Sequence, residues 1–172
     1  MSAIQSEIKQ SKPFPSKAAE GLVALLRTTD VLRRVLSEVV ETRGITLQQY
    51  NVLRILRGAG AEGLPTLEIG ERMIEQSPGV TRLLDRLEAK ALVRRERCPR
   101  DRRQVTCRIS PDGLAVLAHL EKPLARAQGA LLGRLGDSRT GELIHLLDQL
   151  RAAARAAVSV RRIRPRQVKE KK

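Results

Sequence analysis

The chain has 172 residues, a length that suits one compact domain or a smaller domain whose extensions are covered by a partner. Apolar residues make up 41% of the sequence and aromatic residues 1%, so any core must consist of Leu, Val, Ile and Ala, which favours packed helices. A net charge of +14 predicts a polyanionic partner, either nucleic acid or an anionic membrane surface. Neither a membrane-spanning apolar run nor a secretory signal is present, so we expect a cytoplasmic protein associated with the nucleoid.

The positive charge is confined to two stretches of the sequence. Residues 77–110 carry a net +6 and residues 151–172 a net +8, whereas residues 21–76 are neutral and 111–150 carry −1. Such a localised excess is typical of a nucleic-acid footprint rather than of a uniformly basic surface.

The first predicted helix covers residues 18–40, where apolar residues recur at helical spacing and Gly44 marks the end. Its apolar surface exceeds what its own turns can cover, so it must pack along other helices. Residues 1–17 before it are expected to form a flexible arm.

Three shorter helices follow the first. Thr46 is a capping residue for a helix that the glycines at 58, 60 and 63 terminate. A short helix begins at Thr66, and a fourth begins at Ser77-Pro78, where Ser can cap and Pro needs no amide partner. The short helix is expected to turn Leu67, Ile69 and Met73 inward. The fourth is expected to run to about Lys90, with Val80, Leu83, Leu84 and Leu87 inward and Pro78, Thr81, Arg82, Asp85 and Ala89 outward.

The hydrophobic period changes to two after Leu92, which predicts a β-hairpin. Residues 93–98 and 103–109 form its strands, with Val93 opposite Ile109, and residues 99–102 form its turn. Helices over about 111–135 and up to 157 complete the chain. The basic residues 158–172 are expected to be disordered.

Two short helices, a tight turn and a basic hairpin follow one another in the order of a winged helix-turn-helix. The segment SPGVTRLLDRLEAKALVRRERCPRDRRQVTCRISPDG (77–113) resembles the core motif of the multiple-antibiotic-resistance regulator (MarR) family. The matching features are a recognition helix of the type S-x-x-x-T-R-L-x-D-x-L-E, a D-x-R wing tip and a wing exit that ends in Gly113. One departure is Ala91, where the family usually has Gly, and slight strain is expected there.

The resemblance implies a domain over residues 18–157 that is mainly α-helical with a small β-wing. Residues 46–110 would be the winged-helix DNA-binding region, and 18–44 and 111–157 would be dimerisation helices, because the corresponding helices of two subunits intertwine in the family. The surplus apolar stripes favour the same homodimer.

Thr81 and Arg82 are the candidates for contacts in the major groove, since Arg can bond both acceptors of a guanine and Thr can touch a thymine methyl. Ser77 is a further candidate, although capping alone explains it equally well. By resemblance, Asp101 holds Arg103 in the minor groove; an exposed turn ion pair is the alternative. The expected phosphate contacts are Arg86, Arg94, Arg95, Arg97, Arg100 and Arg102.

Other reactive residue types give little sign of chemistry. Cys98 and Cys107 are out of register for a bridge across the hairpin and are interpreted as an exposed wing residue and a core residue. His119 and His145 lack neighbours at ligand spacing, so no metal and no cofactor is expected. Tyr50 fits either a core position or the pocket in which some family members hold aromatic acids. No catalytic constellation is present, so we do not expect an enzyme.

These observations predict a homodimeric, sequence-specific regulator that binds double-stranded DNA at an inverted repeat. The resemblance implies a repressor relieved by a small aromatic-acid effector. A non-specific architectural DNA- or RNA-binding protein is the alternative, and the basic residues after 158 favour it.

Overall fold

The computed structural model describes residues 2–75, 79–97 and 105–163, with side chains as far as residue 157. The chain divides into two compact units, Met1–Ala127 and Gln128–Lys172. No helix in the described ranges combines the length and the apolar character that crossing a bilayer requires. The elements are α1 (Ala3–Glu7), α2 (Lys17–Glu41), α3 (Leu47–Ala59), the 3₁₀ turn η1 (Gly60–Glu62), β1 (Leu64–Pro65), α4 (Thr66–Arg72), α5 (Val80–Ala89), β2 (Val93–Arg97), β3 (Val105–Ile109), α6 (Pro111–Leu132), the 3₁₀ turn η2 (Gly133–Leu135) and α7 (Gly136–Ile163).

The helix starts follow from local hydrogen bonds that the sequence predicts. Thr46 and Gln49 form a capping box: the Thr46 Oγ1 accepts from the Gln49 amide at 3.2 Å, and the Gln49 Oε1 accepts from the Thr46 amide at 3.0 Å. Ser110 caps α6 by accepting from the Gly113 amide at 3.0 Å. The expected cap of α5, Ser77, lies outside the described residues, and the described helix begins at Val80.

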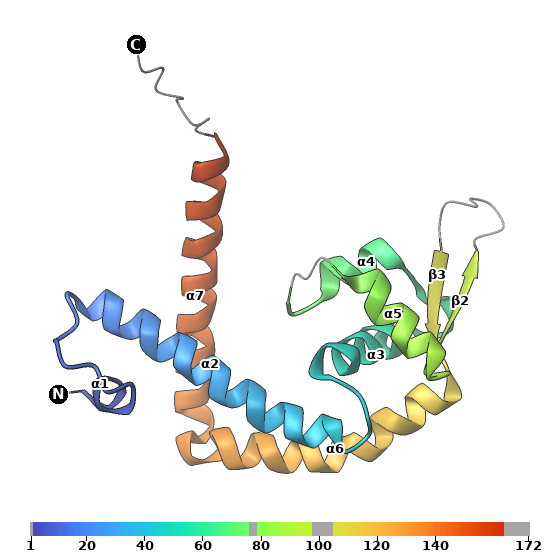
Figure 1. Cartoon of the computed structure of the whole chain (residues 1–172), viewed down its shortest axis with the longest axis horizontal. Coiled ribbons are helices and arrows are strands. Elements are labelled where there is room, and N and C mark those ends of the chain that lie inside the picture. The colour runs from blue at the N-terminus through green and yellow to red at the C-terminus, as the bar shows by residue number, and fades with distance from the viewer. Residues whose placement is uncertain (1, 76–78, 98–104, 164–172) are drawn as a thin grey trace. The chain divides into compact units, whose positions relative to one another are not determined.

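Among the described residues, the buried apolar side chains form one cluster in the first unit, made by the end of α2, α3, α4, α5, the sheet and the first half of α6. Figure 1 shows where these elements lie. Ile69 on α4 is fully buried and Met73 is 6% exposed, as predicted. The prediction that Leu67 points inward is wrong, because its side chain is 76% exposed. Two residues before Ile69 on an α-helix means a rotation of roughly 200°, which puts Leu67 on the opposite face of this seven-residue helix.

The sheet has the strand order β1-β3-β2, and both pairs are antiparallel. Val93 pairs with Ile109, which confirms the predicted hairpin register, and Arg95 pairs with Cys107. Leu64 of the two-residue β1 pairs with the same Cys107 from the other side. Cys107 is therefore central in the sheet and fully buried. Cys98 and the predicted turn of the hairpin lie outside the described residues.

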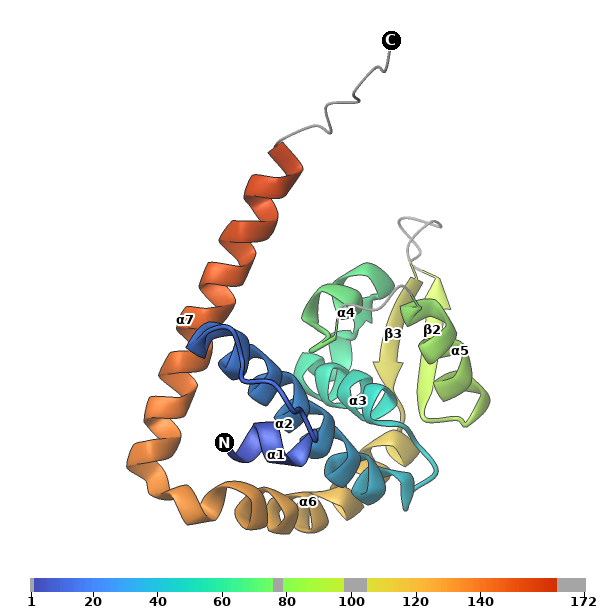
Figure 2. The same ribbon diagram turned by 60° about the vertical axis from the view of Figure 1, so that its left-hand side comes forward.

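The two ends of the chain differ from what the sequence predicts. The arm expected to be flexible contains α1, which lies beside α2 (Figures 1 and 2) and is joined to it by Glu7 and Arg27, whose Oε1 and Nε are 2.7 Å apart. In the second unit α7 extends to Ile163, past the expected start of the disordered tail at residue 158. Residues 164–172 lie outside the described part.

Candidate nucleic-acid interface

The exposed face of α5 carries the predicted major-groove residues. Leu84 and Leu87 are fully buried and Leu83 is 8% exposed, so one face of the helix is fixed in the core. The opposite face presents Thr81 and Arg82 to solvent, as the helical period predicts. Asp85, Arg86 and Ala89 are exposed as well. A helix held by one apolar face and free on the other can enter a groove without unfolding.

The arginines of this region fall into two groups by their partners. Arg57 is paired with Glu121 at 2.9 Å, Arg72 with Glu68, and Arg108 with Glu96 at 2.5 Å. A second group of exposed arginines has neither an ion pair nor a hydrogen bond within the described residues. Its members are Arg82 and Arg86 on α5 and Arg94 and Arg97 on β2. Their charges are available to a phosphate backbone.

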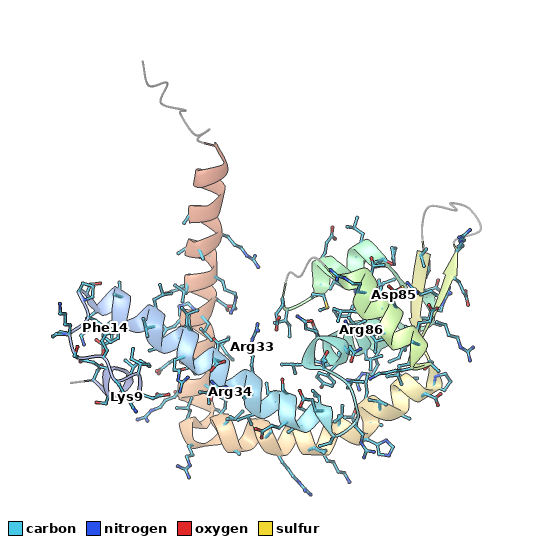
Figure 3. The ribbon with its side chains drawn as sticks, viewed as in Figure 1. Lys9, Phe14, Arg33, Arg34, Asp85 and Arg86 are labelled. Carbon is cyan, nitrogen blue, oxygen red and sulfur yellow. The ribbon has the colours of Figure 1, made fainter. Side chains whose placement is uncertain are left out.

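Arg95 belongs to the paired group, and the phosphate contact expected for it stays a prediction. Its Nη2 lies 2.7 Å from the Asp85 Oδ1 and 2.5 Å from the Glu88 Oε2, and its Nε donates to the same Glu88 oxygen at 2.7 Å. Its backbone amide donates to the Glu88 Oε1 at 3.2 Å. The hydrogen bond to Glu88 raises the pKa of the Arg95 guanidinium, and the one to Asp85 adds to the effect. Figure 3 shows Asp85 on α5 beside the β2–β3 hairpin.

A Schellman turn connects α5 to the wing. The Ala91 amide donates to the Glu88 carbonyl at 2.8 Å and the Leu92 amide to the Leu87 carbonyl at 3.0 Å, while Leu92 and Leu87 pack in the core. Ala91 has a φ of +57°, so this residue takes a left-handed conformation that favours glycine. The departure noted in the sequence therefore falls on the one residue of the turn where strain arises.

The exit from the wing is packed against this turn. The Ser110 Oγ donates to the Ala91 carbonyl oxygen at 2.7 Å. A Cβ added at Gly113 would lie 2.3 Å from the Leu92 carbonyl oxygen and 2.8 Å from the Ile109 Cγ1. Only glycine fits at position 113, and this close approach holds both ends of the hairpin against the end of α5.

Several predicted site residues fall outside the described part of the chain. Ser77, which precedes α5, is one of them. The others belong to the predicted wing turn and its edges: Arg100, Asp101, Arg102 and Arg103. Their roles in binding remain predictions.

Tyr50 lies on α3, half-buried, and its ring packs against the core. The Arg54 guanidinium carbon lies 5.9 Å from the ring centroid. Both the core position and an aromatic-acid pocket remain compatible with this placement.

The remaining reactive side chains have structural partners. Burial raises the pKa of the Cys107 thiol, and its Sγ lies 3.8 Å from the Thr66 Oγ1, which suits a core residue. The Nδ1 of His119 lies 2.7 Å from the Ala115 carbonyl oxygen, and the Nε2 of His145 lies 2.8 Å from the Gln149 Nε2. Within the described ranges no three His, Cys, Asp or Glu side chains converge as a metal site would need.

The sequence reasoning missed the carboxylates that hold Arg95. The helical period puts Asp85 on the outer face of α5, and Glu88 is the last residue of the family's recognition-helix motif. A usable signal exists, since two acids on the last turns of a helix precede an arginine on the first strand that follows. Their spacing alone does not select Arg95 over Arg94 as the partner.

Comparisons with known proteins agree with this geometry. A family model described as the MarR family matches residues 45–105. The crystal structure of a MarR transcription factor from Planctomyces limnophilus is 36% identical, with a TM-score of 0.62, and the match covers 80% of this chain and 99% of that one. The chain belongs to the MarR family.

Two further relatives of this MarR-family chain extend the comparison. A transcriptional regulatory protein for the hcr operon of Thauera aromatica is 29% identical over 118 residues, which are 69% of this chain and 70% of that protein. The S. aureus MepR–DNA complex shares the fold at 20% identity, with a TM-score of 0.69, over 76% of this chain and 96% of that one. The family is one of transcriptional regulators, and the winged helix-turn-helix predicted from the sequence is confirmed.

Proposed function

We propose that this MarR-family chain binds double-stranded DNA as a homodimer at an inverted repeat. In this arrangement, the α5 helices of two subunits enter successive major grooves about 34 Å apart. The observation that carries the proposal is the solvent-facing side of α5, where Arg82 and Arg86 have no ionic partner within the described residues, although Arg57 and Arg72 nearby are paired. A regulator bound in this way would act on the nucleoid.

The proposed contacts are of two kinds, those that recognise the base sequence and those that bind any DNA backbone. Thr81 and Arg82 read base edges in the major groove, with Ser77 beside them, and Arg103, oriented by Asp101, reads the minor groove. The phosphate contacts add affinity without sequence preference. They come from Arg86, Arg94 and Arg97, together with Arg100 and Arg102 of the predicted wing turn.

Dimerisation is supported by apolar side chains that their own unit leaves exposed. On α7, Leu143, Leu146 and Leu150 recur at spacings of three and four residues and are 36%, 61% and 46% exposed. On α2, Leu22 and Leu26 are 56% and 62% exposed. Apolar stripes of this kind mark a protein interface, and a second copy of the chain carries the same stripes.

Regulation is proposed to be repression relieved by a small aromatic acid. Tyr50 supports this ligand class, because its half-buried ring offers a stacking surface and Arg54 beside it offers a positive charge for a carboxylate. Ligand binding would be detected as quenching of the fluorescence of Tyr50, the one tyrosine in the chain.

The decisive experiment is selection of preferred duplexes from a random pool, followed by affinity measurements at fixed salt. Arg82→Ala should cost about 1–3 kcal/mol of discrimination at one base pair in each half-site. The control Arg94→Ala should weaken binding to all duplexes alike and reduce the salt slope by about 0.9. Removing residues 159–172 should lower affinity without changing the preferred sequence. A wild-type chain that enriches no sequence would instead indicate non-specific, architectural binding.

A further inference from the structure

Arg94 and Arg95 are neighbouring arginines with opposite surroundings. Successive side chains of a strand point to opposite faces, so the two cannot share an environment. Arg94 is exposed and has no partner in the described chain, whereas the Arg95 side chain is 23% exposed and contacts two carboxylates of α5. The two residues therefore allow the same side chain to be compared in a paired and an unpaired position.

Both the side chain and the backbone of Arg95 connect β2 to the recognition helix α5. The guanidinium binds both Asp85 and Glu88, which lie almost one turn apart on α5. The backbone amide of Arg95 binds the other oxygen of Glu88, so the main chain of β2 is held as well. Together with the turn at Ala91, these contacts give the hairpin a second attachment to α5 and oppose a hinge motion between them.

Arg95 also changes the charge that α5 presents. Asp85 lies on the exposed face, in the turn after Thr81 and Arg82, and its side chain is 51% exposed. A free carboxylate there would repel phosphates, and Glu88 would add a second negative charge. The Arg95 guanidinium, 2.7 Å from the Asp85 carboxylate, offsets that repulsion.

We propose that Arg95 is a positioning residue that fixes the wing relative to α5 and offsets part of the negative charge of Asp85 and Glu88, rather than a phosphate contact. The inference rests on the proposed DNA-binding function. It implies that the spacing between the base pairs read by α5 and those read by the wing is set by the Arg95 contacts.

The test compares Arg95→Met with the matched control Arg94→Met, on the full-length chain and on the duplex selected by the wild type. Arg94→Met should reduce the salt slope by about 0.9, the value for one lost phosphate contact. Arg95→Met should leave the salt slope unchanged. It should lower the affinity by roughly tenfold, as for other coupled contacts, and reduce the discrimination between base pairs at the outer positions read by the wing. A purely structural role would lower thermal stability without changing which base pairs are preferred.

A second variant gives an effect of opposite sign and does not depend on the folding of Arg95→Met. Asp85→Asn combined with Glu88→Gln releases Arg95, so the salt slope should become steeper by about 0.9 and binding to random duplexes should strengthen. Adding Arg95→Met to this pair should remove the increase.

The outcomes separate the two proposals. A wild-type chain without any preferred duplex would overturn the proposed function. If the wild type has a preferred duplex but Arg95→Met reduces the slope as Arg94→Met does, or if Asp85→Asn with Glu88→Gln leaves the slope unchanged, the positioning role is contradicted and the proposed function stands.

Discussion

The leucine side chains of α5 are buried, whereas most of those of α7 are exposed to solvent. On α5, Leu84 and Leu87 are fully buried by α3, the sheet and the neighbouring helices of the first unit. On α7, Leu146 is 61% exposed and Leu150 46% exposed. A buried leucine stabilises its own fold by about 1.5–3 kcal/mol, whereas an exposed one contributes this only when a partner covers it. The packing of α5 is therefore complete within one chain, whereas the exposed leucines of α7 would be covered only in the proposed dimer.

The largest expected effect is on assembly. Leu146→Lys places a charge at the centre of the exposed stripe on α7, and a two-fold interface contains each position twice. The dimer should lose roughly 3–6 kcal/mol, taken as two buried leucines, so its dissociation constant should rise by at least about a hundredfold in analytical ultracentrifugation. The control Ala152→Lys lies on the opposite side of the same helix and is exposed. An equal shift for both variants would mean that charge, not the apolar stripe, governs assembly.

A smaller effect is expected in the core of the winged helix. Leu84→Ala leaves a cavity beside the recognition helix and should cost about 2–5 kcal/mol of unfolding free energy, measured by chemical denaturation at a fixed chain concentration. The matched control is Leu67→Ala on α4, which should change stability by less than about 0.5 kcal/mol because that side chain is 76% exposed. Comparable losses for both would show that Leu67 has a partner in the assembled protein.

The smallest effect concerns the turn between α5 and the wing. Ala91→Gly removes the strain of a left-handed alanine and should stabilise the fold by about 1 kcal/mol, seen as a higher melting temperature. Ala89→Gly, at the last residue of α5, should instead destabilise the fold, by up to about 1 kcal/mol. Destabilisation by both substitutions would mean that residue 91 is not left-handed in solution.

The sequence predicted those features that depend on short-range chemistry. The cap at Thr46 and the pairing of Val93 with Ile109 each follow from local sequence patterns, and both are confirmed. The exposed position of Thr81 and Arg82 follows equally from the period of the apolar residues on α5.

Features that depend on three-dimensional geometry could not be predicted in this way. The contact between Glu7 and Arg27 that holds α1 joins residues twenty positions apart in sequence, and α1 is too short to show a hydrophobic period. Asp85 pairs with Arg95 and not with Arg94 because of the orientation of β2 after the Ala91 turn. The buried face of a seven-residue helix such as α4 is likewise poorly determined by its own pattern, which is why the sequence predicts the wrong face for Leu67.

In the proposed complex, two copies of α5 read two half-sites of one DNA duplex. The most direct measurement compares binding to the selected inverted repeat with binding to a duplex in which five base pairs are inserted between the half-sites, while the bound mass is recorded. We expect two chains per duplex on the original site and a loss of most of the specific affinity after the insertion, because the half-sites then face opposite sides of the helix. Equal affinity for both duplexes, with one chain bound, would contradict the claim.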